Sequence, residues 1–308
     1  MCIRDSTQTF KRPLWKRAAI WLFEKPWINA PLVNFLKSIR APVWRDRLPV
    51  MSGMSQVILP RATGITMLAP ERCNVARETW WHDGELAEIA DRNALALAID
   101  LACDADLFLD IGSYTGLFAL AVARNVPSIH CHAFEIVPEN FLLLWKNVIH
   151  NDLIGRITVR LEGAGDMQGK IRVPIDLEAG VLPSSVALDS NTQRGVVVPV
   201  SRVDDMITAR GVKLVIKIDV EGYEWNVLSG ATELTEDCLP DIICEFLTRA
   251  PDILVISNHL RALGYRFYRI TASGLKASND IVPIKLERDW LLTTRTTEDL
   301  ATLGWEVN

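Results

Sequence analysis

Short apolar runs alternate with helical patterns through the middle of this 308-residue chain, and this alternation restricts the fold more than any other feature. The runs are apolar on both faces, as parallel strands are when helices cover both sides of a sheet. We therefore expect a doubly wound, Rossmann-like α/β sheet. Its strands are predicted at 107–109, 129–134, 157–161, 214–218 and 242–246, and its helices at 115–125, 138–151, a segment ending near 230, and 252–263.

The flanks of this pattern define the rest of the domain. Strands at 265–270 and 290–293 have only a long loop between them, so the mostly parallel sheet should end in an antiparallel C-terminal edge. Prolines and glycines punctuate β-like runs in residues 166–203, which favours a β-rich, hairpin-like insertion there. With short β-like runs within 56–80 and an amphipathic helix over 85–103, the domain is expected to span 56–308, with its core at 80–250.

Residues 1–55 form a basic, tryptophan-rich segment. The first 50 residues hold ten Lys and Arg against three Asp and Glu, although the whole chain carries a net charge of −5. Pro26 and Pro31 should break this helical arm into short helices. Two interpretations remain open. In the first, residues 11–47 lie on anionic lipid as a peripheral membrane contact. In the second, the arm packs on the body of the protein or on a second copy in a homo-oligomer.

Bulk properties narrow the class of protein. An acidic body argues against nucleic acid as a partner. The six cysteines form no CxxC pair, which is typical of reduced thiols in a cytoplasmic protein. The arm would place that protein at the inner face of the membrane if it binds lipid. The apolar run at 18–23 is far too short to span a bilayer.

A glycine-containing turn follows the first core strand. Two glycines allow a tight turn and let backbone amides approach a ligand at the start of the next helix. A dinucleotide site would show three glycines as GxGxxG, whereas this turn has two and begins with an acid. It suits a ligand that lacks phosphate and carries an amino group. The candidate contacts are Asp110, Gly112, Ser113, Tyr114, Thr115 and Gly116.

Glu135 ends the next strand, 23 residues after Gly112. This is close to the spacing of an acid that binds a ribose diol. Asp166, in the loop after the third strand, could accept from an adenine amino group, or could be an ordinary solvated acid. Together with the turn, Glu135 indicates a nucleoside-type ligand.

Three ionisable residues, Lys217, Asp219 and Glu221, alternate along the strand that should be buried on both faces. Burying such groups is costly unless they pair or line a cleft. Ligands of open α/β sheets bind at the carboxyl ends of strands, where this cluster falls. A structural pair between Lys217 and one acid is the alternative, but it would not account for both carboxylates.

Taken together, these blocks resemble the FkbM family of S-adenosylmethionine (SAM) methyltransferases. The resemblance covers roughly residues 80–250 and rests on 110–116, 133–135 with Pro138, Glu139 and Asn140, and 216–224. Ser113 and Tyr114 stand where the family usually has Ala-Asn, which affects the contact to the methionine end of SAM. The resemblance adds Asn140 to the residues expected to bind SAM.

The resemblance implies O-methylation of a hydroxyl on a sugar, a polysaccharide or a secondary metabolite. Such a reaction needs donor and acceptor aligned, water excluded and a general base near the hydroxyl. Asp219 is the first candidate for the base and Glu221 the second, while Lys217 would keep the carboxylate ionised or steady the acceptor oxygen. Carboxylates could instead hold a divalent cation, but no His–carboxylate spacing supports this, so no metal is expected.

Two other functions fit parts of the pattern. One is a nicotinamide-dependent oxidoreductase, against which the missing third glycine and the acid in the first turn both count. The other is a non-catalytic Rossmann-like binding module that uses the basic arm as its contact surface.

Overall fold

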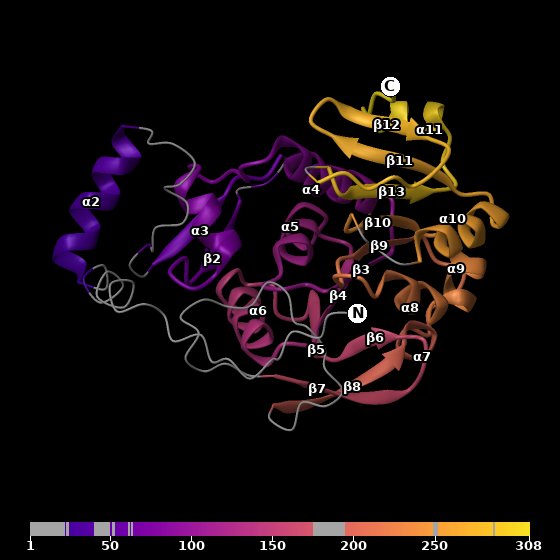
Figure 1. Cartoon of the computed structure of the whole chain (residues 1–308), viewed down its shortest axis with the longest axis horizontal. Coiled ribbons are helices and arrows are strands. Elements are labelled where there is room, and N and C mark those ends of the chain that lie inside the picture. Colours follow the sequence, from indigo (N-terminus) through magenta and orange to yellow (C-terminus); the bar gives the residue numbers. More distant parts are fainter. Residues whose placement is uncertain are drawn as a thin grey trace, which may run out of the picture.

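A computed structural model describes residues 22, 25–39, 50, 53–60, 62, 64–174, 195–248, 252–285 and 287–308. Its centre is an eight-stranded sheet with the order β12-β11-β13-β10-β9-β3-β4-β5 (Figure 1). The parallel strands are β3 (Leu107–Ile111), β4 (His130–Glu135), β5 (Ile157–Leu161), β9 (Leu214–Ile218) and β10 (Asp241–Glu245). The antiparallel strands are β11 (Arg266–Thr271), β12 (Gly274–Ser278) and β13 (Asp289–Thr293).

This topology confirms the doubly wound sheet with an antiparallel C-terminal edge. The stretch between β11 and β13, expected to be only a loop, contains the additional strand β12, which pairs with β11.

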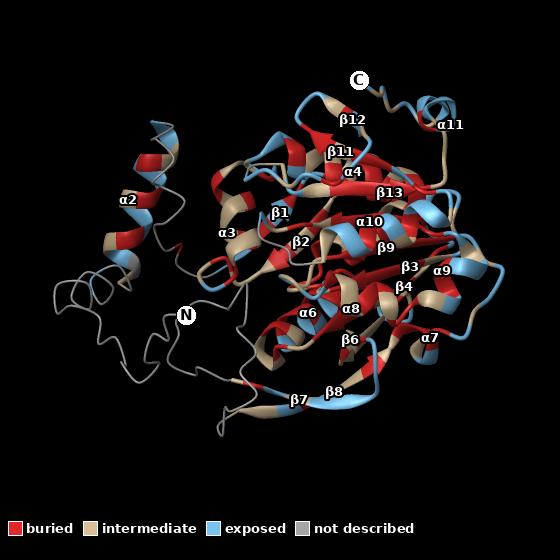
Figure 2. Cartoon of the chain, turned by 45° about the vertical axis from the view of Figure 1, so that its right-hand side comes forward, coloured by how far each residue is buried: buried red, intermediate tan, exposed pale blue. Residues whose placement is uncertain are grey.

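Side chains that alternate along the strands fill two separate cores, one on each face of the sheet. Phe108 and Val215 pack on one side, under α4 (Ile89–Ala102), α5 (Leu117–Asn125) and α6 (Pro138–His150). Leu109 and Ile216 pack on the other, under α7 (Val203–Met206), α8 (Glu224–Ser229), α9 (Thr232–Cys238) and α10 (Ile253–Ala262). Figure 2 shows the strands buried between these layers. Burial on both faces explains why the strand sequences are almost continuously apolar.

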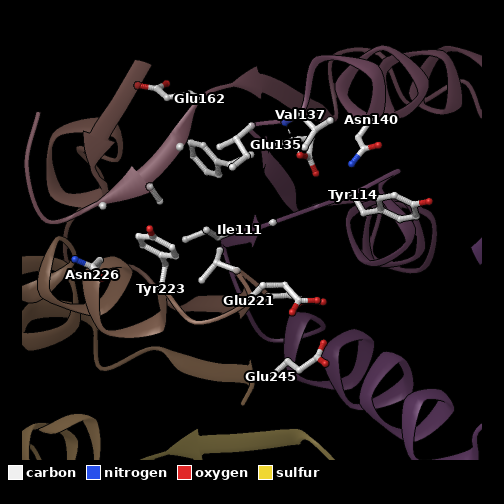
Figure 3. Close-up of a pocket in the computed structure, with 18 of the residues that line it drawn as sticks. Ile111, Tyr114, Glu135, Val137, Asn140, Glu162, Glu221, Tyr223, Asn226 and Glu245 are labelled. Atoms are coloured by element: carbon white, nitrogen blue, oxygen red, sulfur yellow. Dashed lines mark hydrogen bonds between the residues drawn. The ribbon is translucent and has the colours of Figure 1, made fainter. Parts of the chain in front are cut away.

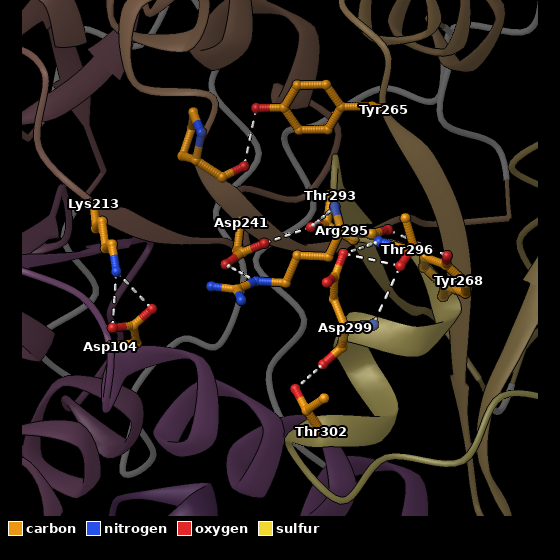
Figure 4. A network of polar contacts seen from close by, with 11 residues as sticks. Asp104, Lys213, Asp241, Tyr265, Tyr268, Thr293, Arg295, Thr296, Asp299 and Thr302 are labelled. Carbon is orange, nitrogen blue, oxygen red and sulfur yellow. Dashed lines mark hydrogen bonds and ion pairs between the residues drawn. The ribbon is translucent and has the colours of Figure 1, made fainter.

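The antiparallel edge is fixed by a polar network (Figure 4). The carboxylate of Asp241, at the start of β10, accepts hydrogen bonds from the Thr293 hydroxyl and from Nε of Arg295 at 2.8 Å. The chain then enters α11 (Thr297–Thr302) through a capping box, in which Thr296 and Asp299 each bond the other's backbone N–H.

The insertion forms a small sheet beside β5. Strands β7 (Gly169–Val173) and β8 (Val196–Arg202) pair antiparallel as a hairpin, and β6 (Gly163–Gly165) pairs parallel with β8. The hairpin agrees with the expected β-rich insertion. Its connecting residues, 175–194, lie outside the described part of the chain.

The N-terminal region differs most from expectation. The helix α2 (Pro26–Ser38) contains Pro31, so the prediction that this proline breaks the arm is wrong. Pro31 lies on the exposed face of α2, where water can bond the carbonyl that its missing N–H leaves free. The other expected parts of the arm, at 11–21, 23–24 and 40–49, lie outside the described residues.

The region before the main sheet also contains more regular structure than expected. Strands β1 (Met54–Val57) and β2 (Ile65–Leu68) form an antiparallel pair, so the expected domain boundary at 55/56 falls inside β1. Residues Asn74–Trp81 form the helix α3, where only β-like runs were expected. The helix predicted over 85–103 begins only at Ile89, after a turn in which Gly84 has φ +99°. None of the helices in the described residues is long and apolar enough to cross a membrane.

Candidate functional site

A cavity of about 610 Å³ opens at the carboxyl ends of β3, β4 and β9 (Figure 3). This volume is in the usual range for pockets that bind a small molecule or a cofactor. Glu135 and Tyr114 lie on one side of the cavity, and Glu221 and Glu245 lie on the other.

The structure brings part of the predicted site together around this cavity. The predicted residues on its wall are Gly112, Tyr114, Glu135, Asn140, Asp166, Asp219 and Glu221. The predicted residues that are not on its wall are Asp110, Ser113, Thr115, Gly116 and Lys217.

Asp110 is part of the packing beneath the site. Its side chain is buried against α5, and Oδ2 accepts a hydrogen bond from the backbone N–H of Ala119 at 3.0 Å. Burial raises the pKa of Asp110 to about 7, although the Ala119 N–H and the Lys217 ammonium favour the ionised form. We therefore reassign Asp110 from ligand contact to anchoring the first turn of α5. Ser113 supports the same turn, because its hydroxyl donates to the Asp110 carbonyl at 2.6 Å.

The turn after β3 is compact because glycine permits contacts that a side chain would block. Gly112 has φ +83°, and a Cβ there would lie 1.8 Å from the backbone oxygen of Asp219. A Cβ on Gly116 would lie 2.3 Å from Leu144 Cδ1 on α6. Gly112 therefore allows the ends of β3 and β9 to pack closely, and Gly116 allows the turn to pack against α6. This packing explains why Gly116 lies behind the cavity wall.

Tyr114 occupies a strained position within this turn. Its φ is +50°, in the left-handed region that side chains larger than Asn rarely adopt. Its phenol oxygen accepts a hydrogen bond from the backbone N–H of Asn74 at 3.3 Å, at the start of α3. The neighbouring Thr115 is also tied to this helix, through the thiol of its N-cap Cys73 at 3.2 Å. These contacts hold α3 against the turn and compensate for the strain.

Glu135 provides an acidic group at the end of β4. Its Oε1 accepts a hydrogen bond from the Val137 N–H at 2.7 Å, which fixes the carboxyl group at the cavity wall. Burial raises its pKa to about 8. Asn140, buried on the following helix α6, lies beside it on the wall.

On the opposite side of the cavity, Asp219 lies directly after β9 and close to Glu245 at the end of β10. Burial and the Asp219 carboxylate raise the pKa of Glu245 to about 8. Arg288 forms an ion pair with Glu245 at 2.7 Å. Glu221, with φ +55°, is the second strained residue on the wall, and burial and Asp219 raise its pKa. The nearby Asp219 carboxylate therefore helps Glu245 to keep its proton.

Lys217 lies beneath these acids and not in the cavity. It is 2% exposed, and its Nζ donates to Oδ1 of Asp289 on β13 at 3.0 Å and lies 5.3 Å from the centre of the Phe118 ring. Burial lowers its pKa, but Asp289, Asp219 and Glu245 outweigh burial, so the pKa is raised and Lys217 stays charged. Lys217 therefore makes a structural ion pair, and it also offers positive charge to Asp219 from below.

Several wall residues were missed from the sequence. They come from α3, from β6, from the start of α8 and from the segment before β13: Asn74, Val75, Glu78, Gly163, Ala164, Gly165, Tyr223, Asn226 and Arg288. The contribution of α3 could have been suspected from the amphipathic spacing of its buried residues Ala76 and Thr79. No local signal marks Arg288, which reaches the site only because β13 pairs with β10. Among the described residues, no group of three or more His, Cys, Asp or Glu side chains is placed to hold a metal ion.

The buried acids predict how the stability of the ligand-free protein depends on pH. The pKa values of Asp110, Glu135 and Glu245 are raised to about 7, 8 and 8, so the folded protein keeps protons that the unfolded chain releases near pH 4. The free energy of unfolding should therefore fall as pH rises from about 6.5 to about 8.5, by roughly 2 kcal/mol or more. Urea unfolding at both pH values measures this; a flat or rising profile would contradict the burial argument.

The parallel part of the sheet has a glycine turn after β3, an acid at the end of β4 and further acids after β9 and at the end of β10. In a doubly wound sheet, this arrangement defines an α/β enzyme that binds a nucleoside-type ligand. The methyltransferase FkbM domain matches residues 110–267, just over half of the chain. The chain belongs to the FkbM methyltransferase family, and its cofactor is SAM. No curated protein matches the sequence significantly.

Three solved structures illustrate what the chain is similar to. A precorrin-6y C5,15-methyltransferase from Geobacter metallireducens is 10% identical with a TM-score of 0.36, covering 65% of this chain and 85% of that chain. A SAM-dependent O-methyltransferase from Thermotoga maritima is 14% identical with a TM-score of 0.37, covering 67% and 66%. TYW2 from M. jannaschii, in complex with AdoMet, is 10% identical with a TM-score of 0.37, covering 80% and 87%. The family assignment rests on the matched domain and not on these distant similarities.

Proposed function

We propose that this SAM-dependent methyltransferase methylates a hydroxyl group on a sugar, a polysaccharide or a secondary metabolite. The observation that carries the proposal is the position of Asp219. It lies on the cavity wall opposite Glu135, beside Glu245 and above the buried Lys217. A carboxylate in this position can take the proton of an acceptor hydroxyl.

The residues at the ends of β3 and β4 fit SAM. Glu135 offers carboxylate oxygens for the ribose hydroxyls, and Asp166 lies on the wall where an adenine amino group could donate to it. Gly112 and Tyr114 line the part of the cavity between Glu135 and Asp219, which is suitable for the methionine end. Bound SAM supplies an activated methyl group, and the protein contributes alignment, exclusion of water and removal of a proton.

The charge at the acceptor side depends on how the acids share their protons. Burial and the Asp219 carboxylate favour the protonated form of Glu245, so Glu245 is the weaker candidate for the base. The charged Lys217 lies beneath the two acids, and Arg288 forms an ion pair with Glu245 from the other side. Glu221 is less suited to be the base, because it is exposed on a strained turn, whereas Asp219 is partly buried.

The wall of the cavity also restricts the acceptor. Within the described residues it carries seven carboxyl groups and one cationic side chain, Arg288, which is already paired with Glu245. An acceptor with its own carboxylate or phosphate beside the reacting hydroxyl would be repelled. A neutral or amine-bearing hydroxyl compound fits this wall better.

A labelled-methyl transfer assay tests the proposal. The purified protein is incubated with SAM labelled at the methyl group and with paired acceptors, such as neutral glycans and the same glycans carrying uronic acids. We expect label in base-stable ether linkages on the neutral member of each pair. Transfer to nitrogen, or a preference for the acidic acceptors, would show that the proposed chemistry is wrong.

Glu135→Gln should weaken SAM binding by about tenfold or more, because ribose hydroxyls favour the ionised carboxylate, which has two oxygens to accept their hydrogen bonds, whereas the amide has one. Isothermal titration calorimetry measures the dissociation constant. Glu162→Gln is the matched control, since it removes one acid from the same wall but lies by the insertion, where Ser201 donates to its Oε1 at 2.6 Å. We expect less than about a threefold change for this control. Equal losses in both variants would point to the overall charge of the cavity and not to a ribose contact.

A further inference from the structure

The helix α2 has one face that fixes it to the body. Val33 and Leu36 are buried together with Val50 and Trp81. Next to them, Nζ of Lys37 donates to the backbone oxygen of Trp80 at 2.7 Å and forms an ion pair with Asp83 at 2.9 Å. The arm therefore packs on α3, as one of the two interpretations of the sequence expected.

The opposite face of α2 is apolar and exposed. Trp27 is 75% exposed, Phe35 is 58% exposed, and Ile39, directly after the helix, is 54% exposed. With Pro31 they follow one another at intervals of four residues, so they form one stripe along the helix. We call Trp27, Pro31, Phe35 and Ile39 the α2 stripe.

The α2 stripe carries no charge at all, which is unusual for a helix face in contact with water. The neighbouring exposed residues of α2 are Ala30, Asn34 and Ser38, and the only ionisable residue in the helix is Lys37, which is bound to α3. Figure 1 shows α2 at the margin of the molecule, to one side of the main sheet.

The charge of the surrounding sequence identifies the kind of partner. Residues 1–50 carry about +7, whereas the remaining 258 residues carry about −12. A second copy that packed stripe on stripe would bring two such positive segments together. An anionic lipid surface attracts the same segment, and tryptophan and phenylalanine are the side chains that insert at the boundary between headgroups and acyl chains.

We propose that the α2 stripe docks on an anionic membrane surface, with Trp27 and Phe35 inserted at the boundary between headgroups and acyl chains. This goes beyond the methyl-transfer function and does not depend on which acceptor is used. It would hold the methyltransferase at a membrane through the exposed face of one surface helix.

Vesicle sedimentation of the full chain tests the proposal. The protein is mixed with vesicles of phosphatidylcholine alone or of phosphatidylcholine with phosphatidylglycerol. We expect binding to the phosphatidylglycerol vesicles only, with release at high salt because the attraction of exposed charges is screened. The double variant Trp27→Ser/Phe35→Ser should bind these vesicles at least about tenfold more weakly than the parent.

Leu254→Ser is the matched control, because Leu254 on α10 is also 75% exposed but lies outside α2. It should bind vesicles like the unmodified chain. Both variants change exposed side chains, so their melting temperatures should stay within a few degrees of the parent, which verifies folding. The proposal is overturned if the parent does not bind anionic vesicles, or if the double variant binds them as tightly as Leu254→Ser. A parent dimer that the double variant abolishes, without any difference in vesicle binding, would assign the stripe to a second copy instead.

Discussion

Asp219→Asn is expected to lower kcat by about 10²-fold or more while the dissociation constant for SAM changes by less than about threefold. The amide keeps the shape of the side chain but cannot take the acceptor proton. SAM binding should persist because Glu135, on the other side of the cavity, is unchanged, and because Gly112 lies against the backbone oxygen of Asp219, which the substitution keeps. Single-turnover methyl transfer and calorimetry measure the two quantities separately.

The pH profile distinguishes a base from a residue that merely shapes the site. In the parent, burial and the Asp219 carboxylate raise the pKa of Glu245 to about 8, so the charge beside Asp219, and with it kcat, should change as pH passes that value. In Asp219→Asn the repulsion that raises the pKa of Glu245 is gone, so any remaining activity should level off at lower pH. Glu221→Gln serves as the comparison and should lose less activity. A normal kcat in Asp219→Asn would place the base elsewhere.

Lys217→Met should destabilise the fold by about 3–5 kcal/mol, the usual effect of removing one partner of a buried ion pair. Asp289 would be left buried opposite a thioether, next to the acids Asp219 and Glu245. Urea unfolding of the SAM-free protein measures the change. The double variant Lys217→Met/Asp289→Leu should recover part of the loss, because it removes the unpaired charge.

Lys213→Met is the matched control for this prediction. Its ion pair with Asp104, at 2.8 Å (Figure 4), is exposed on both sides and should contribute less than about 1 kcal/mol. If Lys217→Met and Lys213→Met cost the same, the buried pair has no special structural role.

The main sheet was predictable because its strands are covered on both faces. Strands β5 and β9 begin and end at the expected residues, and most of the other strand and helix limits in the main sheet shift by one or two residues. Two-sided burial makes such strands apolar throughout, which a sequence pattern detects directly. The same reasoning predicts a cleft at the ends of the strands, and Glu135 and Asp219 lie on the cavity wall there.

The positions of Asp110 and Lys217 could not be predicted in the same way. They are direct neighbours in the pairing of β3 with β9, and both side chains face the layer of α4 and α5. A sequence shows that an acid lies near a strand end, but whether it points at a ligand or into a helix depends on where the strand actually stops. The position of Arg288 on the cavity wall depends on the pairing of β13 with β10. This pairing is a long-range contact with no local signal in the sequence.

The contact between Gly112 and the backbone oxygen of Asp219 has a consequence for how this enzyme can change its substrate. The turn proposed to bind the methyl donor and the residue proposed as the base meet at this contact, so neither can shift without disturbing the other. New acceptor preferences must therefore arise on parts of the cavity wall that do not take part in this contact. Those parts are the β6–β8 sheet, α3 and the segment that carries Arg288.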